Sequence, residues 1–121
     1  MRYRYEETRY EITVPGLAEG TRLRTVLLTD LHNCDYDGIL PLLEKRKPDR
    51  VLCTGDMINC LAFPKVPSWD IALAFYAELA RRYPVYAVPG NHEERWKTTE
   101  DDKIRAEYES FRQQLRELGI R

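Results

Sequence analysis

Three short apolar runs in this chain each lead into a cluster of polar side chains and glycines. The clusters that follow the runs are Thr29-Asp30-Leu31-His32-Asn33, Gly55-Asp56-Met57-Ile58-Asn59 and Pro89-Gly90-Asn91-His92-Glu93. Residues i and i+2 of an extended chain lie on the same side, so Asp30 and His32 can point to one spot. Because ligand sites in open α/β sheets lie beyond the carboxyl ends of the strands, the three clusters predict one shared site.

Two helices are predicted between the three strands, which the sequence places at residues 22–29, 50–54 and 85–88. The first helix spans residues 38–46 after the capping residue Asp37, and the second spans 69–82 after Ser68. Strand, helix and strand at this spacing form the parallel crossover of α/β proteins. We therefore expect an α/β fold with a mostly parallel sheet.

The remaining segments carry signals of their own. Residues 2–14 alternate in part between apolar and polar side chains, which predicts a half-buried strand or hairpin. Residues 60–68 contain two prolines and predict an irregular loop. A capping signal at residues 98–102 precedes an amphipathic helix of about five turns, with Gly119 at its C-terminal end. We expect a further strand to begin at Ile120-Arg121.

Length, charge and cysteine content exclude several classes of protein. The 121 residues form one domain at most, with a formal net charge of −1 that attracts neither nucleic acid nor an anionic membrane. No apolar run approaches the roughly 18 residues of a membrane span, and the first residues lack the apolar core of a signal peptide. Three cysteines, Cys34, Cys53 and Cys60, favour a reducing compartment over a disulfide framework. We expect a cytoplasmic protein.

The side chains of the three clusters suit a metal centre. Carboxylate, imidazole and amide groups form a mixed oxygen and nitrogen ligand set, which favours Mn, Fe or Zn over a thiolate site. A carboxylate such as Asp56 is able to bridge two cations. Two metals about 3.5 to 4 Å apart clamp a phosphoryl group and lower the pKa of a bound water.

The ordered triple Asp-x-His, Gly-Asp-x-x-Asn and Gly-Asn-His-Glu, each after a predicted strand, resembles the first three motifs of the calcineurin-like metallophosphoesterases. The resemblance runs from about Arg22 to Glu93. It implies the N-terminal half of a metallophosphoesterase β-sandwich flanked by helices, with a mostly parallel sheet and an N-terminal β-hairpin. It also implies a hydrolase that uses two divalent metal ions, manganese among them, on a phosphomonoester or phosphodiester substrate.

The resemblance also assigns roles to individual residues. Asp30 and His32 would bind the first metal, Asp56 would bridge, and Asn91 would bind the second metal. His92 would give a proton to the leaving group or stabilise the transition state.

This chain departs from the family pattern in two ways. The later motifs, a lone histidine and Gly-His-x-His, do not occur, because the only histidines are His32 and His92. We therefore expect residues 1–121 to be a single truncated domain, either a fragment or a truncated gene product, which a second copy would complete as a homo-oligomer.

The other departure is Asn59, where many relatives have an aspartate that orients the catalytic histidine. Asn59 is able to accept a hydrogen bond from His92 but cannot stabilise an imidazolium by charge.

The sequence after Asn59 also bears on the branch of the family. Asn59 is followed by Cys60-Leu61, so the Asp-Arg-Gly of the Ser/Thr protein phosphatases is absent and a protein phosphatase is disfavoured. The N-terminal part looks more like the bacterial membrane-associated branch, whose members often carry an N-terminal anchor that this chain does not show.

Two non-enzymatic interpretations stand beside the hydrolase. One is an inactive metal- or phosphate-binding half-domain without the C-terminal ligands. The other is a scaffold, which is disfavoured because Asp and His at core strand ends are costly without a metal to pair them. Glu93 and Asn59 are divided between supporting the site and purely local roles. Three aromatic residues are expected to pack in the core rather than to stack on substrate: Trp69, Tyr76 and Tyr108.

Overall fold

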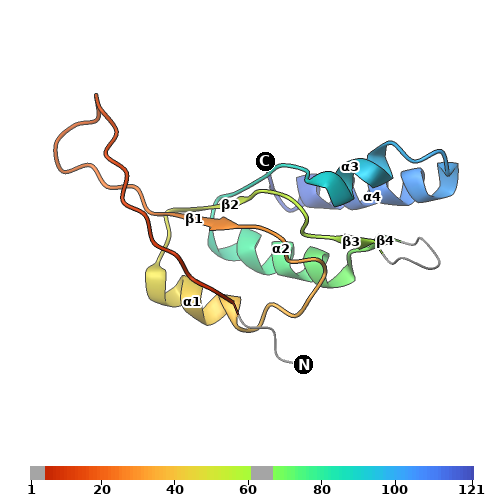
Figure 1. Ribbon diagram of the computed structural model, residues 1–121, viewed down its shortest axis with the longest axis horizontal. Coiled ribbons are helices and arrows are strands. Elements are labelled where there is room, and N and C mark those ends of the chain that lie inside the picture. Colours follow the sequence, from red (N-terminus) through yellow and green to blue (C-terminus); the bar gives the residue numbers. More distant parts are fainter. Residues whose placement is uncertain (1–4, 61–66) are drawn as a thin grey trace.

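The computed structural model describes residues 5–60 and 67–121, and a three-stranded parallel sheet lies at its centre (Figure 1). The strands are β1 (Thr25–Leu28), β2 (Arg50–Cys53) and β5 (Val85–Ala87), in the spatial order β1-β2-β5. Both pairs of neighbouring strands are parallel. The α/β class with a mostly parallel sheet is therefore confirmed, although each strand is shorter than predicted.

The crossover helices α1 (Ile39–Arg46) and α2 (Asp70–Arg82) lie on the same face of the sheet (Figure 1). The strand order advances in one direction, and crossovers of the usual right hand then place successive helices on one side. Strand side chains that face these helices are buried, with Val51 0% and Cys53 1% exposed. Opposite them lie the apolar positions of α2, spaced at three and four residues: Ala72, Phe75, Tyr76 and Leu79.

The other face of the sheet carries a row of larger side chains. Leu27 pairs with Leu52 across β1 and β2, and Leu52 pairs with Tyr86 across β2 and β5. Because side chains alternate along a strand, this row points away from α1 and α2. Leu27 remains 59% exposed, as expected for a sheet that the two crossover helices cover on one face.

Two helices follow the sheet, α3 (Asn91–Lys97) and α4 (Asp102–Glu117). The predicted amphipathic helix is confirmed in α4, whose N-cap Asp101 accepts hydrogen bonds from two backbone N–H groups. Phe111 of α4 stacks on Trp69 with ring centroids 5.4 Å apart, which docks α4 beside α2. Beyond the C-cap, the backbone of Arg121 makes two hydrogen bonds with β5, in keeping with the expected further strand.

The predicted N-terminal strand or hairpin is wrong for the described residues. Residues 5–24 contain no strand, and residues 1–4 of the predicted element lie outside the described part. Tyr10 and Ile12 are 81% and 82% exposed. Alternation alone cannot form a strand, because a strand needs a neighbour that accepts its backbone hydrogen bonds.

The side-chain caps predicted for the two crossover helices, Asp37 and Ser68, are wrong. Gly38 occupies the N-cap of α1 and Trp69 that of α2, and neither makes a side-chain capping bond. At α2 the reason is tertiary, because the Asn33 side chain accepts a hydrogen bond from the N–H of Ala72 at 2.9 Å.

The predicted loop over residues 60–68 is corrected at its ends. There β3 (Asn59–Cys60) pairs antiparallel with β4 (Pro67–Ser68), and residues 61–66 lie outside the described part. Among the helices of the described residues, none is long and apolar enough to cross a membrane.

Candidate metal centre

The loops that follow β1 and β2 run side by side as an extension of the sheet. Three backbone hydrogen bonds join them: Asp30 N–H to Gly55 O at 3.1 Å, His32 N–H to Asp56 O at 2.9 Å and Asn33 N–H to Met57 O at 2.8 Å. Since these three bonds tie the loops together, the side chains of the first two polar clusters are held at one edge of the sheet.

The backbone of these loops adopts an uncommon conformation. Asp30, His32, Asn33 and Asp56 have φ values of 58°, 52°, 55° and 52°, in the left-handed region. Asn, Asp and His are the non-glycine residues most often found there. Such conformations cost of order 1–3 kcal/mol each and cluster at functional sites. The backbone conformation of these loops therefore lowers stability, and its effect is to orient the side chains of the site.

The loops after β2 and β5 approach each other backbone to backbone. A Cβ added to Gly55 would lie 2.5 Å from the backbone nitrogen of Gly90, and one added to Gly90 would lie 2.3 Å from Oδ1 of Asp56. Gly55 also has a φ of 107°, which a side chain rarely allows. Glycine at both positions is therefore a requirement of the site.

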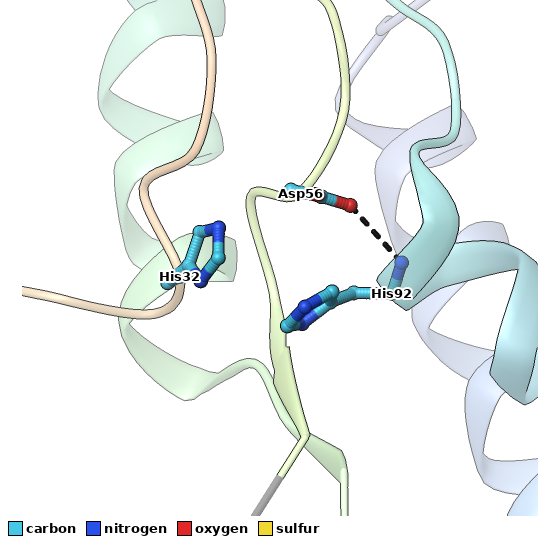
Figure 2. Close-up of side chains that lie close together, drawn as sticks. All are labelled: His32, Asp56 and His92. Carbon is cyan, nitrogen blue, oxygen red and sulfur yellow. Dashed lines mark hydrogen bonds between the residues drawn. The ribbon is translucent and has the colours of Figure 1, made fainter.

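His32, Asp56 and His92 bring one ligand atom each to within 4.8 Å of one another. Figure 2 shows that they come from three segments, the loop after β1, the loop after β2 and the start of α3. The imidazole rings of His32 and His92 have centroids 4.7 Å apart, and Oδ1 of Asp56 accepts a hydrogen bond from the backbone N–H of His92 at 3.0 Å. The three polar clusters of the sequence therefore meet at one point.

Asp30 lies at the edge of this group. Its Oδ1 is 3.2 Å from Nε2 of His32, and its side chain is 59% exposed. The hydroxyl of Thr29 donates to Oδ2 at 2.6 Å, and this bond, followed by the contact with His32, lowers the pKa of Asp30. Asp30 is thus a carboxylate beside His32, although it is not one of the three residues that converge.

Asn91 and Asn59, the two asparagines predicted for the site, lie in different elements. Asn91 is the first residue of α3, and its side-chain amide lies against the Asp56 carboxylate. With the amide nitrogen turned toward Asp56, Asn91 donates to Oδ2 at 2.7 Å and to Oδ1 at 3.1 Å. With the amide turned the other way, the carbonyl oxygen, which is the atom able to bind a metal, faces the same carboxylate. Asn59 lies in β3 and is paired in register with Ser68.

Glu93 is one of the two residues, with Asn59, whose role the sequence left open. It is 6% exposed, and its carboxylate accepts hydrogen bonds from the backbone N–H groups of Asp56, Met57 and Gly90. The last of these bonds is half of a capping box, in which the third helical residue reaches back to the N-cap. A glutamate three residues after Gly90 was a usable signal for α3, a helix that was not predicted from the sequence.

Asn33 is a supporting residue that sequence reasoning missed. Its Nδ2 donates to the Ser68 hydroxyl at 2.7 Å and to Asp70 Oδ1 at 2.8 Å, while its Oδ1 accepts from Ala72. Asn33 follows His32 directly, so these bonds attach the first site loop to the start of α2. The hydrogen bond from Asn33 also lowers the pKa of Asp70.

Comparison with known protein families matches residues 23–119 to the calcineurin-like phosphoesterases. The match covers the sheet, the crossover helices and all three polar clusters, and the chain belongs to this family. No solved structure matches the chain significantly. The family is metal-dependent, and the group formed by His32, Asp56 and His92 is a possible metal site.

Proposed function

We propose that this protein is a metal-dependent phosphoester hydrolase that acts on a phosphomonoester or phosphodiester with two divalent cations. The observation that carries the proposal is the convergence of His32, Asp56 and His92 within 4.8 Å, in a chain of the calcineurin-like phosphoesterase family. Metal bound there supplies Lewis acidity to a phosphoryl oxygen and lowers the pKa of a water.

The residues present fit a divalent cation. Two imidazoles and a carboxylate are a common donor set for Zn, Fe and Mn. Nδ1 of His92 is buried and has no hydrogen-bond partner, and a buried polar atom of this kind is costly unless something pairs with it. The left-handed conformations of His32 and Asp56 carry a further free-energy cost, which metal binding would offset.

We assign Asp30, His32 and Asp56 to the first cation, and Asp56 and Asn91 to the second. Asp30 is held beside His32 and Asn91 beside Asp56, so each lies next to a member of the converging group. We assign Mn, Fe or Zn because the donor set mixes oxygen and nitrogen.

His92 is proposed to hold the proton that the leaving oxygen receives, with Asn59 orienting its ring. This role competes with direct binding of the metal, because His92 belongs to the converging group. The His92→Ala variant separates the two roles. If His92 is the proton donor, the variant binds Mn²⁺ with nearly unchanged affinity and loses turnover. A loss of Mn²⁺ binding by this variant would make His92 a ligand instead.

A second candidate function is metal binding without hydrolysis. It is favoured by one observation, that the converging group supplies donors for a single cation among the described residues. Two cations would rely on Asp30 and Asn91, which lie at the edge of the group.

The test is hydrolysis of an aryl phosphomonoester and an aryl phosphodiester with added Mn²⁺, with Mn²⁺ binding measured in parallel by calorimetry. Asp56→Asn is the site variant, and Asp102→Asn, a first-turn acid of α4 with an 88% exposed side chain, is the matched control. Turnover and binding that vanish in Asp56→Asn alone support the hydrolase. Binding without turnover supports the second candidate. Equal behaviour of both variants and the wild type contradicts the proposed site.

We further propose that the protein self-associates through the sheet face that carries Leu27. Apolar side chains on this face and at the end of β5 are exposed, with Leu27 at 59% and Val88 at 57%. Exposed apolar surface of this kind favours association. Light scattering should show a dimer or larger assembly for the wild type and a smaller one for Leu27→Glu, whereas a monomeric wild type at high concentration would refute this.

A further inference from the structure

We propose that Glu93 is a positioning residue of the metal centre, which fixes the orientation of Asp56 relative to His92. The proposal rests on the proposed function in one respect, that the site binds a divalent cation. It adds a residue that touches neither metal nor substrate and acts through the backbone of the loop that carries Asp56.

The Glu93 carboxylate joins two segments that are distant in the sequence. Its Oε2 accepts from the N–H of Asp56 at 2.9 Å and from that of Gly90 at 3.0 Å, and its Oε1 accepts from Met57 N–H at 2.9 Å. Burial of a carboxylate is costly unless hydrogen bonds compensate, and three backbone donors provide that compensation. Glu93 therefore holds the loop after β2 against the start of α3.

The start of α3 holds Asp56 at two places. Glu93 binds the backbone N–H of Asp56, and the backbone N–H of His92 binds its side-chain Oδ1 at 3.0 Å. A carboxylate held at both its backbone and its side chain has little freedom to rotate. The direction of Asp56 toward His32 and His92 is therefore set by the helix that carries His92.

Packing alone does not provide this restraint. The contact between Gly55 and Gly90 brings the two backbones together, whereas the Glu93 carboxylate holds the N–H of Asp56 by a directional hydrogen bond. Groups that hydrogen-bond to metal ligands commonly change metal affinity or activity by about tenfold to a hundredfold when they are mutated. A role confined to stability would instead lower affinity only by unfolding the protein.

The experiment measures Mn²⁺ affinity by calorimetry and the urea midpoint for the wild type, Glu93→Gln and two controls. Glu94→Gln alters the neighbouring acid of α3, which pairs with Lys97 at 3.5 Å. Leu43→Ala removes a core side chain of α1 that is 2% exposed and is not one of the proposed ligands, so it lowers stability without removing a ligand. If Glu93→Gln fails to fold, Glu93→Asp replaces it, because aspartate retains the carboxylate but is one methylene shorter.

We expect the Glu93 variant to bind Mn²⁺ about tenfold to a hundredfold more weakly, and both controls to bind like the wild type within about twofold. A folded Glu93 variant with wild-type affinity would overturn the proposal, and so would an equal loss in Leu43→Ala. Amide hydrogen exchange of the wild type gives a second readout that needs no metal. The N–H groups of Asp56, Met57 and Gly90 should exchange as slowly as those of β2. Exchange at the rate of an open loop would show that their hydrogen bonds to Glu93 do not persist, and it would overturn the proposal even if the protein binds no Mn²⁺.

Discussion

Gly90 and Asp56 are so close that a Cβ on Gly90 would lie 2.3 Å from Oδ1 of Asp56 and 2.6 Å from its backbone nitrogen. The backbone of Gly90 has a φ of −95°, which alanine also adopts, so the restriction is purely steric. Gly90→Ala should therefore displace Asp56 and destabilise the protein by about 1–3 kcal/mol, the usual cost of overpacking. Urea unfolding and Mn²⁺ calorimetry would measure both effects.

The control for Gly90→Ala is Gly38→Ala. Gly38 also has a negative φ, and an added Cβ there meets only the Tyr5 ring, at 3.2 Å. The control should keep wild-type Mn²⁺ affinity. Unchanged affinity in Gly90→Ala as well would show that the contact with Asp56 does not orient the ligand.

Removal of the Asn33 side chain should loosen the link between the first site loop and α2. The amide of Asn33 makes three hydrogen bonds, to Ser68, Asp70 and Ala72. Asn33→Ala leaves the first turn of α2 without this cap, and we expect a loss of about 1–3 kcal/mol in the free energy of unfolding. A urea midpoint equal to that of the wild type would contradict the capping role.

Asn33→Asp should reverse the pH dependence that Asp70 contributes. In the wild type the pKa of Asp70 is lowered by the hydrogen bond from Asn33, so its contribution to stability is present above the ordinary pKa of 3.8 and is lost as pH falls. In the variant two carboxylates face each other, which raises their pKa values, so the variant is weakened at neutral pH and recovers as pH falls. Urea midpoints at pH 7 and near pH 4 would test this; a variant that only loses stability in acid would contradict it.

Cys53 should make the protein less stable at alkaline pH. Burial raises the pKa of its thiol from 9.0 to about 12. Between these values the unfolded chain loses the proton and the folded chain keeps it, so stability present below pH 9 declines as pH rises toward 12, with a slope of about 1.4 kcal/mol per pH unit from this group. Cys53→Ala should be less stable at pH 7 but show a shallower decline. Cys34→Ala, at a half-buried thiol, is the control and should keep the wild-type slope.

Phe111 should be the main anchor of α4. It is 2% exposed and stacks on Trp69, so Phe111→Ala should cost about 3–5 kcal/mol in the free energy of unfolding. Leu118, at the C-cap of the same helix, is 36% exposed, and Leu118→Ala should cost about 1 kcal/mol or less. Equal losses for the two variants in urea unfolding would contradict the packing of α4 on α2.

The predictions from sequence succeeded where local pattern and chain order suffice. The parallel crossover around α1 and the apolar face of α4 follow from periodicity, and Gly119 ends its helix with a φ of 83° as expected. The sequence pattern failed to predict the structure where contacts with another segment of the chain determine it. Residues 5–14 alternate but form no strand, and α3 was not predicted, because its first turn, Asn91-His92-Glu93, was assigned to the site alone.

The sequence by itself determined where the strands lie along the chain and which polar residues follow them, because short-range periodicity and turn residues specify these features within a few positions. Only the tertiary structure decided that Glu93 binds the backbone at Asp56 and Met57, and that Asn33 caps α2. These bonds join residues more than 30 positions apart. Closing a loop of that length costs conformational entropy, so such a hydrogen bond forms only when the packing of the core offsets that cost. No local pattern carries that information, since the donors are backbone N–H groups that every residue except proline possesses.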